Sequence, residues 1–191
     1  MGLFVGRLRN LKAFVNLRFA LNPARNDEML LLSQGRSPII VQTRAGNPFD
    51  VSRVTLSGNL FVLADEALQR RHPFATPRTQ VSGFYNCHGL VFAGRRAGID
   101  DYSLIDRILR EDCFEHVTLQ DLLPGDIAIY YDNQSGEAIH SAVVVSVPTP
   151  DNPLEVITVI SKWGTGREYL HKLSDCEYSA TSRVEFRRIK T

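Results

Sequence analysis

Cys87 is the residue of this chain whose position best suits a nucleophile. It directly follows Asn86, a residue type that caps the N-termini of helices, and a helix is predicted over residues 86–97. A thiol in the first turn of a helix feels the positive end of the helix dipole and lies beside unpaired N–H groups, and both favour the thiolate. The same N–H groups could hold an oxyanion, and Gly89 leaves room for a substrate. The structural alternative for Cys87 is a small buried hydrophobe.

A thiolate nucleophile needs a base, and His140 is the best placed of the five histidines. It lies near the start of an apolar strand predicted over residues 139–147, where an imidazole needs a polar partner. The alternative is a core histidine. His171 is the second candidate for the base. His88 is adjacent to Cys87, but neighbouring residues of a helix point about 100° apart.

The elements that would position this pair are predicted helices followed by predicted strands. A second helix is predicted over 102–110. A Leu-Pro-Gly-Asp turn at 123–126 feeds a strand predicted over 127–131, with the strand at 139–147 antiparallel to it. Further strands are predicted at 154–161 and 183–189. This order indicates an α+β domain.

The N-terminal part of the chain is less regular, and we interpret residues 1–75 as an extension of a domain formed by residues 76–191. Apolar residues at helical spacing, with basic residues between them, predict a helix over 3–19. That helix either packs on the body of the protein or binds a membrane surface or a protein partner. Short strands at 39–41 and 51–56 and a helix at 59–71 are predicted after it.

Composition narrows the class of protein. The chain has 191 residues, which suits one domain or one domain with an appendage, and a net charge of +1 gives no electrostatic footprint for nucleic acid. Three cysteines do not make a disulfide scaffold, and we expect a reducing compartment. With no long apolar run and no signal peptide, we expect synthesis in the cytoplasm, with a dedicated export route left open.

No cofactor is expected from the motifs of this chain. There is no phosphate-cradling glycine motif. A zinc site built from two Cys/His pairs is disfavoured because no Cys-x-x-Cys pair is present. The four residues of those pairs are Cys113, His116, His171 and Cys176.

Three segments taken in order resemble the NlpC-like cysteine peptidases and amidases, a branch of the papain-like fold. Tyr-Asn-Cys-His-Gly-Leu-Val at 85–91 is similar to the nucleophile segment of that family. Leu-Pro-Gly-Asp-Ile-Ala-Ile-Tyr at 123–130 is similar to its Pro-Gly-Asp strand, and Ile-His-Ser-Ala-Val-Val at 139–144 to its histidine strand. The resemblance covers residues 83 to about 170 and implies a papain-like core with a nucleophile helix packed on an antiparallel sheet.

The resemblance also implies roles for the residues around the pair. A third polar residue orients the histidine from the next strand, and the match places Ser161 there, with Lys162 and His171 as alternatives. Tyr85 and Asn86, just before the nucleophile, are assigned to the oxyanion and the substrate. A Ser-Lys-Trp-Gly run at 161–164 stands where papain-type enzymes have Ser-Trp-Gly after an asparagine.

The function expected from these residues is hydrolysis of an amide through a Cys-His pair. The resemblance points to peptidoglycan stem peptides or related γ-linked amides as substrates. Two rivals stay open. One is another acyl transfer on the same pair, such as transamidation, deamidation or lipid acyl transfer. The other is a binding module that keeps the fold with an idle site.

Overall fold

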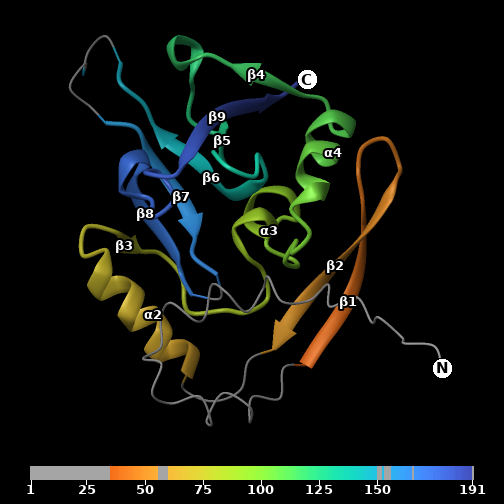
Figure 1. Ribbon diagram of the computed structural model, residues 1–191, viewed down its shortest axis with the longest axis horizontal. Coiled ribbons are helices and arrows are strands. Elements are labelled where there is room, and N and C mark those ends of the chain that lie inside the picture. The colour runs from red at the N-terminus through yellow and green to blue at the C-terminus, as the bar shows by residue number, and fades with distance from the viewer. Residues whose placement is uncertain (1–34, 56–59, 150–151, 153–155, 165, 191) are drawn as a thin grey trace, which may run out of the picture.

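The computed structural model describes residues 35–55, 60–149, 152, 156–164 and 166–190 (Figure 1). Its main element is a seven-stranded antiparallel sheet with the strand order β3-β8-β7-β6-β5-β9-β4. The strands are β3 (Thr76–Pro77), β4 (Phe114–Val117), β5 (Ile127–Asp132), β6 (Ala138–Ser146), β7 (Thr158–Lys162), β8 (Glu168–Lys172) and β9 (Ser182–Ile189). With few helices beside this sheet, the protein belongs to the α+β class, as its sequence predicts.

The centre of the sheet is the β5–β6 hairpin, which forms where the sequence predicts it. Five consecutive residues of β5 are buried, as expected for an interior strand with a covered face on each side. The turn is stabilised by the carboxylate of Asp132, which accepts the N–H groups of Gln134 and Ser135. Gly136 there has a φ of 72°, which glycine adopts without steric cost.

The helices are short and differ in how well the sequence predicts them. Helix α4 (Ser103–Glu111) buries Ile105, Ile108 and Leu109, the stripe expected for an amphipathic helix. Helix α3 (Cys87–Phe92) has six residues, so the helix predicted over 86–97 ends five residues early. The chain leaves the helical conformation at Gly94 and Arg95, whose φ angles of 55° and 64° are left-handed.

The N-terminal elements lie on two sides of the sheet. Strands β1 (Gly35–Gln42) and β2 (Pro48–Thr55) form an antiparallel hairpin near α3 and α4, and α2 (Leu60–Arg71) lies beside β3 and β8 (Figure 1). Phe49 and Val51 of β2 belong to the same apolar cluster as Ile127 of β5. The hairpin therefore shares a core with the sheet, and the division of the chain at residue 75 stays a prediction.

Other elements sharpen or correct the sequence-based expectations. The helix at 59–71 and the strand at 183–189 are confirmed as α2 and β9, while the strand predicted over 154–161 is observed as β7. Strands β3, β4 and β8 were not predicted. The helix predicted over 3–19 lies outside the described residues. No helix in the described ranges is long and apolar enough to cross a membrane.

Candidate functional site

Asn86 fixes the start of helix α3, as predicted for an N-cap. Its side-chain oxygen accepts the N–H of Gly89 at 2.9 Å and that of Ile99 at 3.1 Å. Its amide nitrogen donates to the carbonyl of Ile99 at 2.8 Å and to Asp100 at 3.3 Å. One side chain thus joins helix α3 to the segment at 99–100. Both polar atoms of the Asn86 side chain are engaged in these hydrogen bonds. A contact of Asn86 with substrate stays a prediction.

Gly89 allows the backbone to pass close to the helix. A Cβ atom at this position would overlap the carbonyl oxygen of Ala97, and it would lie 3.0 Å from the Cβ of Tyr85. The carbonyl of Gly89 also accepts the N–H of Arg95 at 3.0 Å. The small residue is therefore required by the packing of residues 93–97 onto α3, a reason different from the substrate access expected from the sequence.

The thiol of Cys87 lies at the N-terminus of α3 in a buried environment. The backbone N–H groups of Ser141, His88 and Cys87 itself act on the sulfur to lower its pKa, and the charge of Lys162 acts in the same direction. Burial has the larger effect and raises the pKa of Cys87 to about 11. The thiol form is therefore favoured in this structure, because loss of water around the sulfur outweighs the effect of the helix N-terminus.

Helix α3 packs on β6, the strand that carries the predicted base, through the contact between His88 and Ser141. His140, the residue before Ser141, is only 1% exposed and lies between the rings of Tyr130 and Tyr178, with centroid distances of 5.3 and 5.0 Å. Burial holds the pKa of His140 well below its ordinary value. Among the described residues, its Nε2 atom has no hydrogen-bond partner. His140 is therefore a neutral imidazole with one unpaired nitrogen.

His88 ties helix α3 to strand β6. Its Nδ1 atom lies 3.0 Å from the hydroxyl oxygen of Ser141, and the ring is fully buried. Burial lowers the pKa of His88 to about 4, so its imidazole is neutral near pH 7. This side chain points to Ser141 and helps hold α3 against the sheet, consistent with its exclusion as the base.

Ser161 and His171 are two candidates for the residue that orients His140, and their side chains form a hydrogen bond with each other. Nδ1 of His171 lies 2.7 Å from the carbonyl of Lys172 and must donate to it, so Nε2 accepts the hydroxyl of Ser161 at 2.7 Å. His171 also lies against Trp163, with a centroid distance of 5.0 Å. The hydrogen bond described for Ser161 is thus with His171, and its predicted role in orienting His140 stays a prediction.

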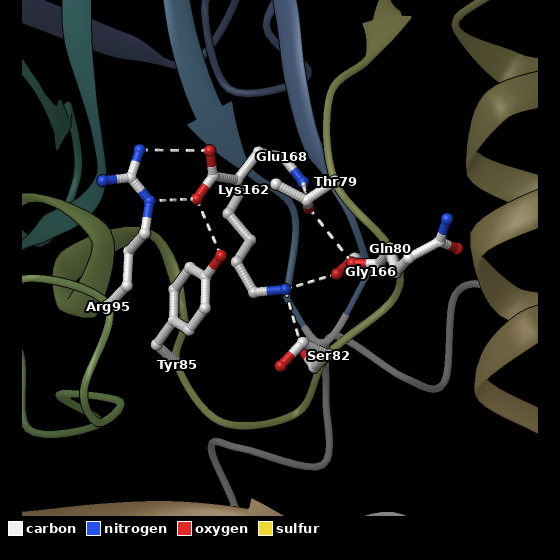
Figure 2. A network of polar contacts seen from close by, with 8 residues as sticks. All are labelled: Thr79, Gln80, Ser82, Tyr85, Arg95, Lys162, Gly166 and Glu168. Atoms are coloured by element: carbon white, nitrogen blue, oxygen red, sulfur yellow. Dashed lines mark hydrogen bonds and ion pairs between the residues drawn. The ribbon is translucent and has the colours of Figure 1, made fainter.

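A second polar network contains Tyr85, two residues before Cys87, together with Arg95 and Glu168 (Figure 2). The hydroxyl of Tyr85 donates to Glu168 at 2.7 Å, and Glu168 also accepts Nε of Arg95 at 2.5 Å. Burial and this carboxylate raise the pKa of Tyr85 to about 12. Because this hydroxyl is directed at Glu168, its expected contact with an oxyanion stays a prediction.

Glu168 and Arg95 are members of this region that sequence reasoning missed. The two residues are 73 positions apart in the sequence. Arg95 follows α3, and Glu168 lies on β8, which pairs with β7 so that Glu168 is opposite Lys162. No local pattern marks either residue. The one signal in the sequence is Lys162, a charged residue at the end of a predicted strand that begins with apolar residues. A charged residue in that position needs a polar partner if it is buried.

The cysteines and histidines do not group around a metal in the part of the chain that the structure describes, where no set of three potential ligands is found. Cys113 is exposed and Cys176 is buried. Comparison of the chain with protein-family models, with curated proteins and with solved structures finds no match. The fold and the site define an α+β protein with a buried thiol, Cys87 on α3, and a buried imidazole, His140 on the neighbouring strand β6.

The buried neutral histidines predict a loss of stability in acid. His88, His140 and His171 all have folded-state pKa values below their ordinary value of 6.5, with about 4 for His88. The unfolded chain therefore binds more protons between pH 6.5 and 4, and the free energy of unfolding should fall as the pH falls through this window. Each proton taken up contributes about 1.4 kcal/mol per pH unit.

Urea denaturation at pH 7, 6, 5 and 4.5 measures this effect. The slope of stability against pH should decrease in a His88→Asn variant, since one of the proton-binding groups is removed. Carboxylates with lowered pKa values, such as Glu168, also reduce the free energy of unfolding as the pH falls. Their contribution comes at pH values near and below the ordinary carboxylate pKa of 4.5, so it affects only the most acidic point. A free energy of unfolding that is constant between pH 7 and pH 5 would contradict the buried neutral state of these imidazoles.

Proposed function

We propose that this chain is a papain-like thiol hydrolase that cleaves an amide, with Cys87 as the nucleophile and His140 as the base. The observation that carries the proposal is the packing of α3 on β6, where Nδ1 of His88 lies 3.0 Å from the hydroxyl oxygen of Ser141. This packing brings the first turn of α3 against the strand that carries His140. A Cys-His pair further requires the imidazole to turn toward the sulfur, because neighbouring strand residues such as Ser141 and His140 point to opposite faces of the sheet.

Because the thiol of Cys87 and the imidazole of His140 are both neutral, the proposed reaction begins with a proton transfer, which the raised pKa of the thiol and the lowered pKa of the imidazole oppose. The thiol proton passes from Cys87 to the unpaired nitrogen of His140 as the sulfur attacks the carbonyl carbon. The tetrahedral intermediate collapses when the carbon–nitrogen bond breaks and His140 returns the proton to the leaving amine. Water, deprotonated by His140, then hydrolyses the thioester, which releases the acid and restores the thiol.

Backbone N–H groups are the favoured donors for the oxyanion in this reaction. The N–H groups of Cys87 and His88 lie near the sulfur and lower its pKa. Once the sulfur is bonded to carbon and carries no negative charge, these donors can turn to the carbonyl oxygen beside it. The hydroxyl of Tyr85 is engaged by Glu168, so backbone N–H groups fit this role better than Tyr85 does.

The substrate class rests on the resemblance of three segments to the NlpC-like enzymes. On that resemblance, we propose peptidoglycan stem peptides or related γ-linked amides. Transamidation or deamidation on the same pair would follow the same acyl-enzyme chemistry, with a different acceptor or leaving group.

One observation favours a second candidate, a binding module with an idle site. Only 8% of Cys87 is exposed, and burial raises the pKa of its thiol. A site that stays closed in this way would not react with an amide. The two candidates differ in whether substrate reaches the thiol.

The test is hydrolysis of a panel of amides by the full chain. The panel contains peptidoglycan stem peptides, other γ-glutamyl amides and ordinary peptides, and release of the free amine is measured. We expect turnover that is lost after blocking of Cys87 by an alkylating reagent. Release of amine at the same rate after Cys87 is blocked would overturn the proposal, and binding of a peptide without turnover would favour the idle module.

A further inference from the structure

Glu168 of β8 is a buried carboxylate that binds residues on both sides of helix α3. Its side chain is only 3% exposed. One oxygen accepts the hydroxyl of Tyr85 at 2.7 Å and Nε of Arg95 at 2.5 Å, and the other lies 3.2 Å from Nη2 of Arg95 (Figure 2). Tyr85 lies two residues before Cys87, and Arg95 lies three residues after the end of α3. A single side chain of the sheet therefore binds both ends of the segment that carries the thiol.

The main chain around Glu168 is itself held in place by hydrogen bonds. Its N–H donates to the hydroxyl of Thr79 at 3.0 Å, and its carbonyl accepts the N–H of Arg78 at 2.8 Å. Glu168 also pairs with Lys162 in the β7–β8 register, and the ammonium of Lys162 donates to the carbonyl of Ser82 at 2.7 Å. The carboxylate is therefore a fixed acceptor on the sheet, whereas its two donors belong to the segment that carries the thiol.

Helix α3 depends on tertiary contacts for its position. It has six residues, a length at which a helix is not stable by itself. The contact between His88 and Ser141 joins its first turn to β6. The contacts of Glu168 join the residues on either side of the helix to β8. Loss of the Glu168 contacts would therefore free the helix from β8 while the contact with β6 remains.

Arg95 is the member of this network that can exchange its protein contact for water. Its side chain is 52% exposed, whereas the carboxylate that it binds is buried. The backbone of Arg95 has a φ of 64°, a left-handed conformation that costs free energy in a residue other than glycine. Release of Arg95 from Glu168 would place its cation in water and allow this strain to relax, and both effects lower the cost of breaking the contact.

We propose that Tyr85, Arg95 and Glu168 form a latch that holds helix α3 against the sheet, and that opening of this latch gives substrate access to Cys87. The inference rests on the proposed function and adds how its closed site is regulated. With the latch closed, Cys87 is 8% exposed. Release of the two donors from Glu168 lets α3 move away from β8, and a substrate can then reach the sulfur. Glu168 acts on Cys87 through these donors and is a positioning residue.

Alkylation of the three cysteines by iodoacetamide at pH 8 measures opening of the latch, with each modified peptide quantified by mass spectrometry. Cys113 is exposed and serves as the reference for the reagent, while the buried Cys176 reports opening elsewhere in the protein. In Tyr85→Phe and Arg95→Met, the rate at Cys87 relative to that at Cys176 should rise about tenfold, because each change removes hydrogen bonds to a buried carboxylate.

A change of charge does not explain such a rise. Tyr85→Phe leaves the charge of the site unchanged, and Arg95→Met removes a positive charge, which disfavours a thiolate. Addition of Arg95→Met to Glu168→Gln should raise the rate at Cys87 no further, because both changes break the same contact. A further rise in the double variant as large as that in Arg95→Met alone would overturn the proposal.

Arg167→Met is the matched control. Arg167 directly precedes Glu168 and binds Asp65 of α2 at 2.6 Å, so it forms a second pair of an arginine with a buried carboxylate. Its replacement should leave the ratio of the two alkylation rates unchanged. An equal rise in Arg167→Met, or an unchanged ratio in both Tyr85→Phe and Arg95→Met, would overturn the proposal. Fluorescence of Trp163, the single tryptophan, shows whether each variant keeps its native packing.

A measurement on the wild-type protein does not depend on the folding of any variant. Opening of the latch exposes little surface, so low concentrations of urea should accelerate alkylation of Cys87 much less than that of Cys176. An equally steep acceleration at both cysteines would overturn the proposal. None of these measurements uses a substrate. The expected alkylation pattern without hydrolysis of any amide would refute the proposed function alone, and hydrolysis without that pattern would refute the latch alone.

Discussion

Replacement of Cys87 by alanine is expected to lower the rate of amide hydrolysis by at least about 10³-fold, because no other group can form the acyl-enzyme. His140→Ala should cause a loss of similar size, since the buried thiol has a raised pKa and depends on a base during attack. The two losses should not add in the double variant, because the residues act as one unit. The measurement is the rate of amine release under single-turnover conditions.

His171→Ala is the matched control for this prediction. His171 is also a buried histidine of the sheet, but its ring is engaged by Ser161 and by the carbonyl of Lys172. We expect its replacement to reduce hydrolysis by less than about tenfold, as for a residue that only supports the site. A loss in His171→Ala as large as in His140→Ala would show that the base is assigned to the wrong histidine.

Replacement of Gly89 by alanine is expected to destabilise the protein and impair the site together. The added Cβ would overlap the carbonyl of Ala97, and neither partner can move without shifting the backbone. Overpacking of this kind costs about 1–3 kcal/mol. Because Gly89 lies two residues after Cys87 and its N–H is bound by Asn86, the shift would also displace the sulfur. Urea denaturation and the hydrolysis rate measure the two effects.

Gly98→Ala provides the control, since Gly98 lies beside the side chain of Asn86. A Cβ there would have its nearest neighbours at 3.5 Å, an ordinary van der Waals distance, and the backbone of Gly98 is not in the left-handed region. We expect a change of less than about 0.5 kcal/mol in this variant, because it adds no overlap. Equal destabilisation by both substitutions would contradict the close packing of α3 against residues 93–97.

The parts of the fold that the sequence predicts well are those with a strong local signal. Apolar runs bounded by turn residues located β5 and β6, and Asn86 before Cys87 located the start of α3. The end of α3 was missed because it depends on left-handed conformations at Gly94 and Arg95, which are fixed by packing against Gly89. A glycine alone does not predict that packing.

The electrostatics of the site could not be predicted from the same signals. A helix N-terminus favours a thiolate and burial opposes it, and only the structure gives the extent of burial at Cys87. The pairing of Ser161 with His171 follows from the pairing of β7 with β8, a strand with no clear alternation in its sequence. Contacts between distant residues, such as Glu168 with Arg95, leave no local trace at all.

The most direct test of the proposed acyl transfer is the mass of Cys87 during turnover. The full chain is mixed with an activated ester of a γ-glutamyl peptide, quenched in acid after milliseconds to minutes, and digested for peptide mapping. The account predicts a mass increase equal to the acyl group on the peptide that contains Cys87, removed by hydroxylamine and absent in Cys87→Ala. Hydrolysis of the ester without any acyl group on Cys87, or acylation that reaches only the exposed Cys113, would contradict it.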